Sequence, residues 1–156
     1  MFRGATKITL DAKGRMAFPT RYRERLMTRA DGHLVATVDR DYCLLIYPLP
    51  DWEEIERKLV RLPALNKQAR RLQRLMVGYA TELDLDGHGR ILLPKELREF
   101  AGLERQAMLI GQGTSSSYGA KNDGALAGTS GWLTTRANRR AYLKNSKRYL
   151  SRARSV

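Results

Sequence analysis

Residues 10–26 read LDAKGRMAFPTRYRERL, and residues 85–101 read LDGHGRILLPKELREFA. The two stretches align without a gap when Asp11 is placed on Asp86. The identical pairs are Ala5 and Ala80, Thr6 and Thr81, Leu10 and Leu85, Asp11 and Asp86, Gly14 and Gly89, Arg15 and Arg90, Pro19 and Pro94, Arg23 and Arg98, and Glu24 and Glu99. An internal repeat determines architecture, so we expect two copies of one small structural unit.

Each copy has the pattern of a strand, a tight turn, a second strand and a helix. Ile8 and Leu10 alternate with polar residues, as in a strand with one buried face. The segments DAKG and DGHG combine an Asp that accepts backbone hydrogen bonds with a Gly that adopts positive φ without strain. Pro19 and Pro94 should end the second strand of each copy. Thr20 is expected to cap the first helix.

The segment between the copies predicts two strands, at 34–38 and 43–47, followed by two helices. Asp51 is expected to start the first helix as the N-cap of a capping box that includes Glu54. Asn66 is expected to start the second helix in the same way. Strands followed by helices in this way predict an α+β fold.

The composition points to a polyanionic partner. The 156 residues include 29 Lys and Arg against 16 Asp and Glu, a formal net charge of +13. Such an excess favours nucleic acid or an anionic membrane surface. No apolar run approaches the ~20 residues of a membrane span, and the start MFRGATKITLD has no apolar signal-peptide core. We therefore expect a cytoplasmic protein without a membrane partner.

Catalytic and metal sites have little support in the sequence. Residues 84–89 resemble the start of a calcium loop, but Lys95 stands where the loop requires a Glu. His33 and His88 have no Cys or His partner at metal-ligand spacing. No Ser or Cys has the context of a nucleophile. We expect no enzymatic activity, no metal, no cofactor and no small-molecule substrate.

The two turns are the best candidates for a functional site. The first places Lys13 at its tip and Arg15 just after it, and the second places His88 and Arg90 in the same positions. An arginine can bind guanine or phosphate through two hydrogen bonds, and a two-stranded ribbon can enter the major groove. A duplex repeats its surface, so a repeated reader favours double-stranded DNA.

Four residues are expected to support these turns: Asp11, Gly14, Asp86 and Gly89. Each Asp either accepts hydrogen bonds from the amides of its own turn or pairs with the Arg four residues later. The alternative interpretation is that each Asp–Arg pair only stabilises its turn and has no ligand.

Residues 1–112 resemble the MraZ family of bacterial transcriptional regulators. The resemblance rests on the segments MFRGAT, LDAKGR, YPLPDWEEIE, RRLQRLMVGYA and LDGHGR. It implies two tandem swapped-hairpin halves of the AbrB/SpoVT type, which form a pseudo-two-fold, β-barrel-like core with flanking helices. It also implies that the chain binds repeated boxes in the promoter of its own gene, at the head of the division and cell-wall gene cluster. The implied assembly is a homo-oligomeric ring, and the implied location in the cytoplasm is the nucleoid.

Carried over by motif, the DNA-reading turns consist of Asp11, Lys13, Gly14 and Arg15 and of Asp86, Gly89 and Arg90. His88 occupies a variable turn position. The resulting division of the chain is a first half at 1–50, linking helices at 51–77, an incomplete second half at 78–112 and an aberrant basic tail at 113–156.

The tail departs from both the repeat and the family. Residues 113–132 read GTSSSYGAKNDGALAGTSGW, without any period, and nine of the 29 Lys and Arg residues follow residue 112. The repeat requires a strand and an aromatic-bearing helix here, and a frame shifted by one base is compatible with the strand N-K-F-E-L-W. We interpret the tail as a frameshift product without regular structure. The alternative is a genuine disordered, basic extension.

The loss of that strand has an expected structural consequence. Ile91, Leu93 and Leu109 would form an apolar face left exposed on the second half.

Two functions from other classes fit the same chain. An RNA-binding protein would use the basic tail and a basic helix face made by Lys67, Arg70, Arg71 and Arg74. An antitoxin-like interaction module would use the hairpin fold to hold a partner protein.

Overall fold

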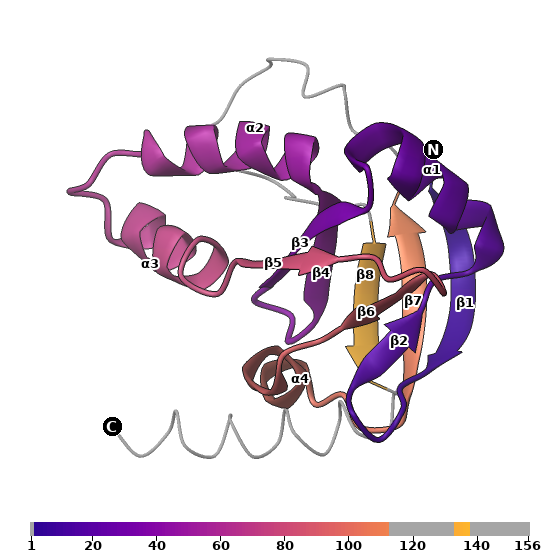
Figure 1. Cartoon of the computed structure of the whole chain (residues 1–156). Coiled ribbons are helices and arrows are strands. Elements are labelled where there is room, and N and C mark those ends of the chain that lie inside the picture. Colours follow the sequence, from indigo (N-terminus) through magenta and orange to yellow (C-terminus); the bar gives the residue numbers. More distant parts are fainter. Residues whose placement is uncertain (1, 113–132, 138–156) are drawn as a thin grey trace, which may run out of the picture.

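The computed structural model describes residues 2–112 and 133–137 (Figure 1). The elements are β1 (Arg3–Thr9), β2 (Arg15–Ala17), α1 (Thr20–Ala30), β3 (His33–Val38), β4 (Leu44–Pro48), α2 (Leu49–Val60), α3 (Lys67–Met76), β5 (Thr81–Asp84), β6 (Arg90–Leu92), α4 (Lys95–Ala101), β7 (Gln106–Gln112) and β8 (Leu133–Ala137). The predicted α+β class is confirmed.

The larger sheet has the symmetry of the sequence repeat. Its antiparallel strands follow the order β1-β7-β8-β4-β3-β5. The edge strands are β1 and β5, the next strands inward are β7 and β3, and the two central strands are β8 and β4. Each strand of one half therefore has a counterpart at the same distance from the centre of the sheet. This pseudo-two-fold arrangement of two tandem halves is the one that the family resemblance implied.

A two-stranded ribbon joins the halves. Strand β2 of the first copy pairs with β6 of the second, and Met16 lies opposite Ile91 at its centre. An isolated bridge between Leu10 and Met16 connects the ribbon to the end of β1. The two sheets are open, and this bridge links them beside the shared core.

Apolar residues of both copies form one core. Leu10, Met16 and Leu26 of the first copy are buried in the same cluster as residues of the second. Ile91 and Leu93 are 1% and 0% exposed. Within the described residues, no helix is long and apolar enough to span a bilayer.

The strand that the repeat requires beside β7 is supplied by β8. Its backbone pairs with both β7 and β4, and Thr135 stands in register with Leu109 on one side and Leu44 on the other. The expected absence of regular structure after residue 112 is corrected for Leu133–Ala137, since the facing edges of β7 and β4 both need hydrogen-bond partners.

The expected exposed apolar face was also wrong. Leu109 is 0% exposed, and it is buried together with Ile91 and Leu93 in the core that both copies share. The other predicted tail residues, 113–132 and 138–156, lie outside the described part of the chain, and the frameshift stays a prediction.

Prolines start the helices that were expected to start with Thr20 and Asp51. Pro19 and Pro48 are the N-caps of α1 and α2, and neither helix has a side-chain cap. Both predicted caps were wrong, because the φ of proline already suits a helix start. The predicted Asn66 cap is confirmed, since its side chain accepts two backbone N–H bonds at the start of α3.

Candidate nucleic-acid interface

One carboxylate organises the first turn. Oδ1 of Asp11 accepts hydrogen bonds from the backbone N–H groups of Lys13 and Arg15, each at 2.9 Å. Oδ2 accepts a hydrogen bond from Nε of Arg15 at 2.6 Å. The two roles that the sequence left open for Asp11, supporting the turn and directing the arginine, are therefore filled together.

The second turn repeats this geometry. Oδ1 of Asp86 accepts from the backbone N–H groups of His88 and Arg90, each at 2.9 Å. Nε of Arg90 donates to Oδ2 at 3.0 Å. The repeated sequence thus forms two turns of the same kind, in each of which an aspartate holds the arginine four residues later.

The hydrogen bonds favour the ionised carboxylates. The backbone N–H of Arg15, followed by its side chain, lowers the pKa of Asp11 from 3.8 to about 2. The backbone N–H of Arg90 likewise lowers the pKa of Asp86. Both carboxylates are charged at neutral pH, so both arginines keep a charged partner at Nε.

Two glycines allow the turns to pack closely. Gly14 and Gly89 have φ of +85° and +70°, and both are buried. A Cβ on Gly14 would lie 2.5 Å from Cζ of Arg98, and a Cβ on Gly89 would overlap Cδ and Nε of Arg23. The positive φ therefore favours glycine at both positions, and a Cβ would also displace the neighbouring guanidinium.

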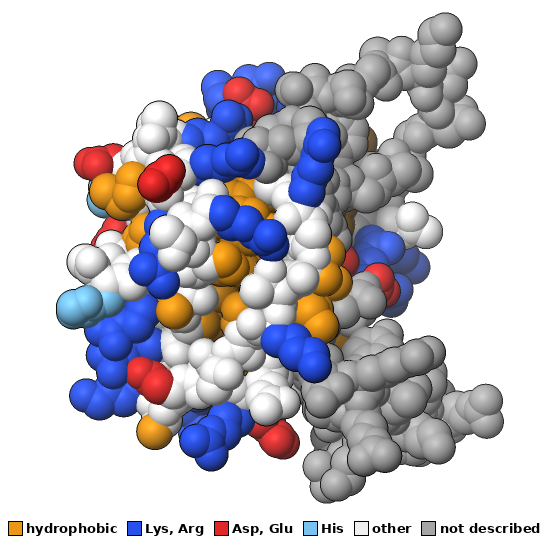
Figure 2. All heavy atoms as spheres, turned by 90° about the vertical axis from the view of Figure 1, so that its right-hand side faces the viewer, with side chains coloured by type: hydrophobic (Ala, Val, Ile, Leu, Met, Phe, Trp, Pro, Cys, Tyr) orange, Lys and Arg blue, Asp and Glu red, His pale blue; other side chains and the backbone are white. Residues whose placement is uncertain are grey.

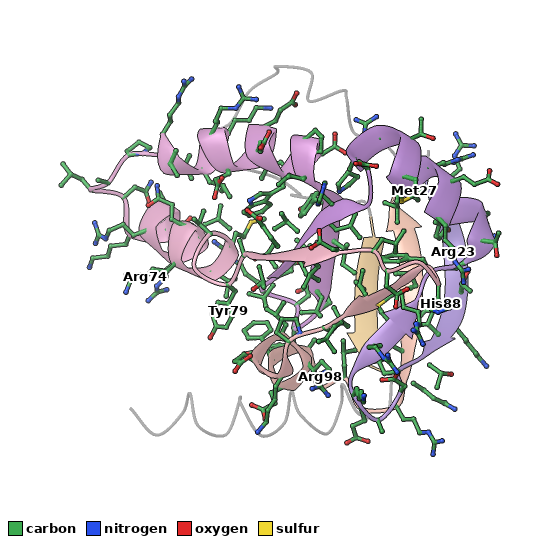
Figure 3. All side chains as sticks on the ribbon, viewed as in Figure 1. Arg23, Met27, Arg74, Tyr79, His88 and Arg98 are labelled. Atoms are coloured by element: carbon green, nitrogen blue, oxygen red, sulfur yellow. The ribbon has the colours of Figure 1, made fainter. Side chains whose placement is uncertain are left out.

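The arginine that covers each turn comes from the other copy. Arg98 belongs to α4 and covers the first turn, whereas Arg23 belongs to α1 and covers the second. Figure 3 shows Arg23 beside His88 at the second turn. Each guanidinium is held by its own copy, since Nε donates to Phe18 O at 2.7 Å in Arg23 and to Leu93 O at 3.0 Å in Arg98.

Backbone hydrogen bonds also link each turn to the other copy. The N–H of Leu93 donates to Gly14 O at 3.0 Å, and the N–H of Phe18 donates to Gly89 O at 2.9 Å. Each turn is therefore tied to the chain just before the helix of the opposite copy.

The outer face of the β2–β6 ribbon carries both predicted arginines. Met16 and Ile91 point into the core, so alternation along the strands places Arg15, Ala17, Arg90 and Leu92 outside. Arg15 stands opposite Leu92, and Ala17 stands opposite Arg90. The two arginines are diagonal neighbours, which places their Cα atoms roughly 7–8 Å apart.

Both arginines keep their terminal nitrogens available. Their side chains are 34% and 32% exposed. Their aspartates accept from Nε. Among the described residues, no hydrogen bond uses an Nη atom of Arg15 or Arg90. The remaining Nη edge is the one that can donate two parallel hydrogen bonds to guanine or phosphate.

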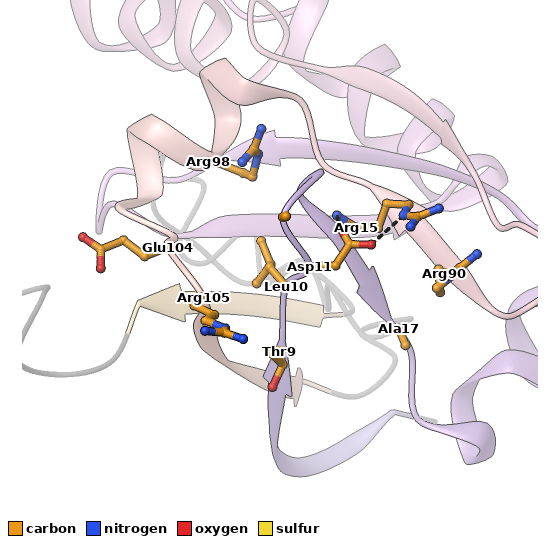
Figure 4. Close-up of a pocket in the computed structure, with 10 residues that line it drawn as sticks. Thr9, Leu10, Asp11, Arg15, Ala17, Arg90, Arg98, Glu104 and Arg105 are labelled. Carbon is orange, nitrogen blue, oxygen red and sulfur yellow. Dashed lines mark hydrogen bonds and ion pairs between the residues drawn. The ribbon is translucent and has the colours of Figure 1, made fainter.

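An open groove of about 790 Å³ runs along this ribbon (Figure 4). Arg98 and Arg105 line it together with the two ribbon arginines, whereas its acidic residues are Asp11 and Glu104. Since Asp11 is already paired, the lining is predominantly positive. Figure 2 shows Lys and Arg side chains over much of the molecular face that includes β1. Such a surface suits a polyanion.

Lys13 and His88 are exposed at the turn tips. The ribbon strands are antiparallel, so these two residues lie at opposite ends of the ribbon, with the arginines between them.

No role was expected from the sequence for Arg23 and Arg98, which cover the turns. The signal that could have indicated such a role is that both copies of the repeat have an arginine at this position.

Comparisons with known proteins show the family of the chain. A family model described as "MraZ protein, putative antitoxin-like" matches residues 1–75 and 76–115. The chain is 62% identical over 113 residues to the transcriptional regulator MraZ of Alkalilimnicola ehrlichii, which covers 72% of this chain and 75% of that relative. It is 58% identical over 113 residues to the protein of the same name from Pseudomonas aeruginosa PAO1, a match that covers 72% of this chain and 75% of that relative.

Proposed function

The chain belongs to the MraZ family of transcriptional regulators, and on that premise we propose that it binds double-stranded DNA through the outer face of the β2–β6 ribbon. The observation that carries the proposal is the pair of Asp-held arginines, Arg15 and Arg90, on one exposed face. A transcriptional regulator is not an enzyme, and this function needs no cofactor.

The ribbon has suitable dimensions for direct readout. The major groove of B-DNA is about 12 Å wide and admits a two-stranded ribbon. A separation of roughly 7–8 Å between Arg15 and Arg90 is close to two base-pair steps of about 3.4 Å. Each arginine would read a guanine with its Nη edge, while Lys13 and His88 bind phosphates at the two ends.

The resemblance to the family supports a proposal for the wider setting. We propose that the DNA is a set of repeated boxes in the promoter of the protein's own gene, ahead of the division and cell-wall genes. A homo-oligomeric ring would present several ribbons at once, and simultaneous binding would raise the overall affinity without new contacts. The corresponding location is the cytoplasm, at the nucleoid.

A competition titration tests the proposed function. The full chain is mixed with a labelled duplex of its own promoter at physiological salt, and unlabelled competitors of equal length are added. We expect the promoter duplex to compete far better than a shuffled duplex or single-stranded RNA. Equal competition by the shuffled duplex would contradict specific DNA binding, and stronger competition by RNA would support the RNA-binding alternative.

The family description favours a second candidate, an interaction module that holds a partner protein. This candidate predicts one stoichiometric protein partner that stays bound after nuclease treatment. It also predicts that loss of the two ribbon arginines leaves the partner complex intact if the partner uses another face.

A further inference from the structure

The ribbon departs from its own symmetry at one pair of positions. The repeat matches Arg15 with Arg90, but it matches Ala17 with Leu92. Leu92 is 54% exposed, although leucine is the kind of residue that usually fills a core. It lies on the same outer face as the arginines and stands directly opposite Arg15.

We infer that Leu92 is a specificity-determining residue that packs against the 5-methyl group of a thymine, beside the base bound by Arg15. This inference rests on the proposed function of the ribbon. The thymine methyl is the apolar group that the major groove presents, and apolar side chains are its usual partners. Cross-strand neighbours have Cβ atoms about 4.5–5.5 Å apart, so Leu92 and Arg15 reach adjacent bases.

The other end of the ribbon cannot make this contact in the same way. Ala17 stands opposite Arg90 and offers only a Cβ, which ends two bonds short of the leucine methyl groups. One end of the ribbon therefore presents Arg15 with Leu92, and the other end presents Arg90 with Ala17. A recognised box should accordingly be asymmetric, although the protein that reads it is built from a repeat.

Thymine-to-deoxyuridine replacement removes only the methyl group and tests the inference. Each thymine of one promoter box is replaced singly, and binding of the full chain is titrated. We expect one replacement to weaken binding of the unaltered protein about three- to fivefold, the effect of one buried methyl group. In Leu92→Ala, that replacement should have no further effect.

Two variants sharpen the test. Leu65→Ala is the matched control, because Leu65 is 93% exposed in the connection between α2 and α3; it should retain the thymine sensitivity. Ala17→Leu should create a second sensitive thymine near the base bound by Arg90.

The outcomes separate this inference from the proposed function. If the unaltered protein prefers the promoter duplex over a shuffled duplex but no deoxyuridine matters, or if Leu92→Ala keeps the full sensitivity, the role of Leu92 is overturned and DNA reading stands. A Leu92→Ala protein that changes its oligomeric state in light scattering while keeping thymine sensitivity would identify an assembly contact instead. If the promoter is not preferred at all, the proposed function fails and the inference fails with it.

Discussion

The guanidinium of Arg98 lies so close over Gly14 that a single added Cβ would come within 2.5 Å of Cζ. Arg23 covers Gly89 in the same manner. Because each arginine belongs to one copy and each glycine to the other, the two turns are positioned reciprocally. The halves of this chain therefore share the proposed DNA-binding ribbon as well as the core.

Arg98→Ala should disturb the first turn more than the second. The guanidinium that packs on Gly14 is removed, whereas the contact between Arg23 and Gly89 remains. We expect the largest backbone NMR shift changes at Lys13 and Gly14. Arg23→Ala is the matched control and should move the largest changes to the second turn. Changes confined to the turn of the mutated copy itself would contradict the reciprocal arrangement.

Gly14→Ala should destabilise the fold, whereas Gly87→Ala should be tolerated. Gly14 has φ of +85° and faces a guanidinium, so substitution adds strain of about 1–3 kcal/mol and displaces Arg98. A Cβ on Gly87 meets nothing within 4 Å, and its effect should stay within about 0.5 kcal/mol. Urea denaturation measures both changes in the free energy of unfolding. Equal losses would show that the close approach at Gly14 is unimportant.

The first turn should resist acid well below the ordinary range of an aspartate. The pKa of Asp11 is lowered in the folded state, from 3.8 to about 2. The stability contribution of this carboxylate is thus fully present above pH 3.8 and is lost as the pH falls through about 2. An NMR titration of the Asp11 carboxyl carbon should give a midpoint near 2, and a midpoint near 3.8 would contradict the turn geometry. Arg15→Ala should raise the midpoint only in part, because the backbone N–H of residue 15 remains.

The gene should contain a frame error close to the end of β7. The family match ends at residue 115, and residues 39–43 connect β3 to β4 whereas residues 113–132 separate β7 from β8. Resequencing genomic DNA across the codons of Gly111 to Thr114 should reveal an extra base that restores a strand directly after β7. An unchanged sequence would establish the tail as genuine and β8 as the natural closing strand.

Much of the fold could be predicted because the same pattern occurs twice. The period of Ile8 and Leu10, the turn residues and the Asn66 cap are local signals, and the structure follows them. The caps at Thr20 and Asp51 failed because a preceding proline competes with any side-chain cap. The division of the chain at residues 50, 77 and 112 stays a prediction, and strand pairing links the parts on either side of these boundaries.

The candidate site could be predicted only in part. An Asp that accepts from nearby amides is local chemistry, so the turn geometry followed from the motif. Which turn Arg23 and Arg98 cover depends on how the copies exchange strands, and a repeated sequence is compatible with either arrangement. The exposure of Leu92 also depends on the register between β2 and β6, which no local pattern determines.

DNA binding by the β2–β6 ribbon is best tested by a fluorescence anisotropy titration of Arg15→Ala and Arg90→Ala against promoter and shuffled duplexes. Each variant should lose about 1–3 kcal/mol of binding free energy for the promoter duplex and much less for the shuffled one. Circular dichroism should remain unchanged, since both arginines lie on the surface. Arg74→Ala, at an exposed position of α3 (Figure 3), should bind like the unaltered protein. Unchanged promoter affinity in both ribbon variants would show that the ribbon arginines do not bind the promoter.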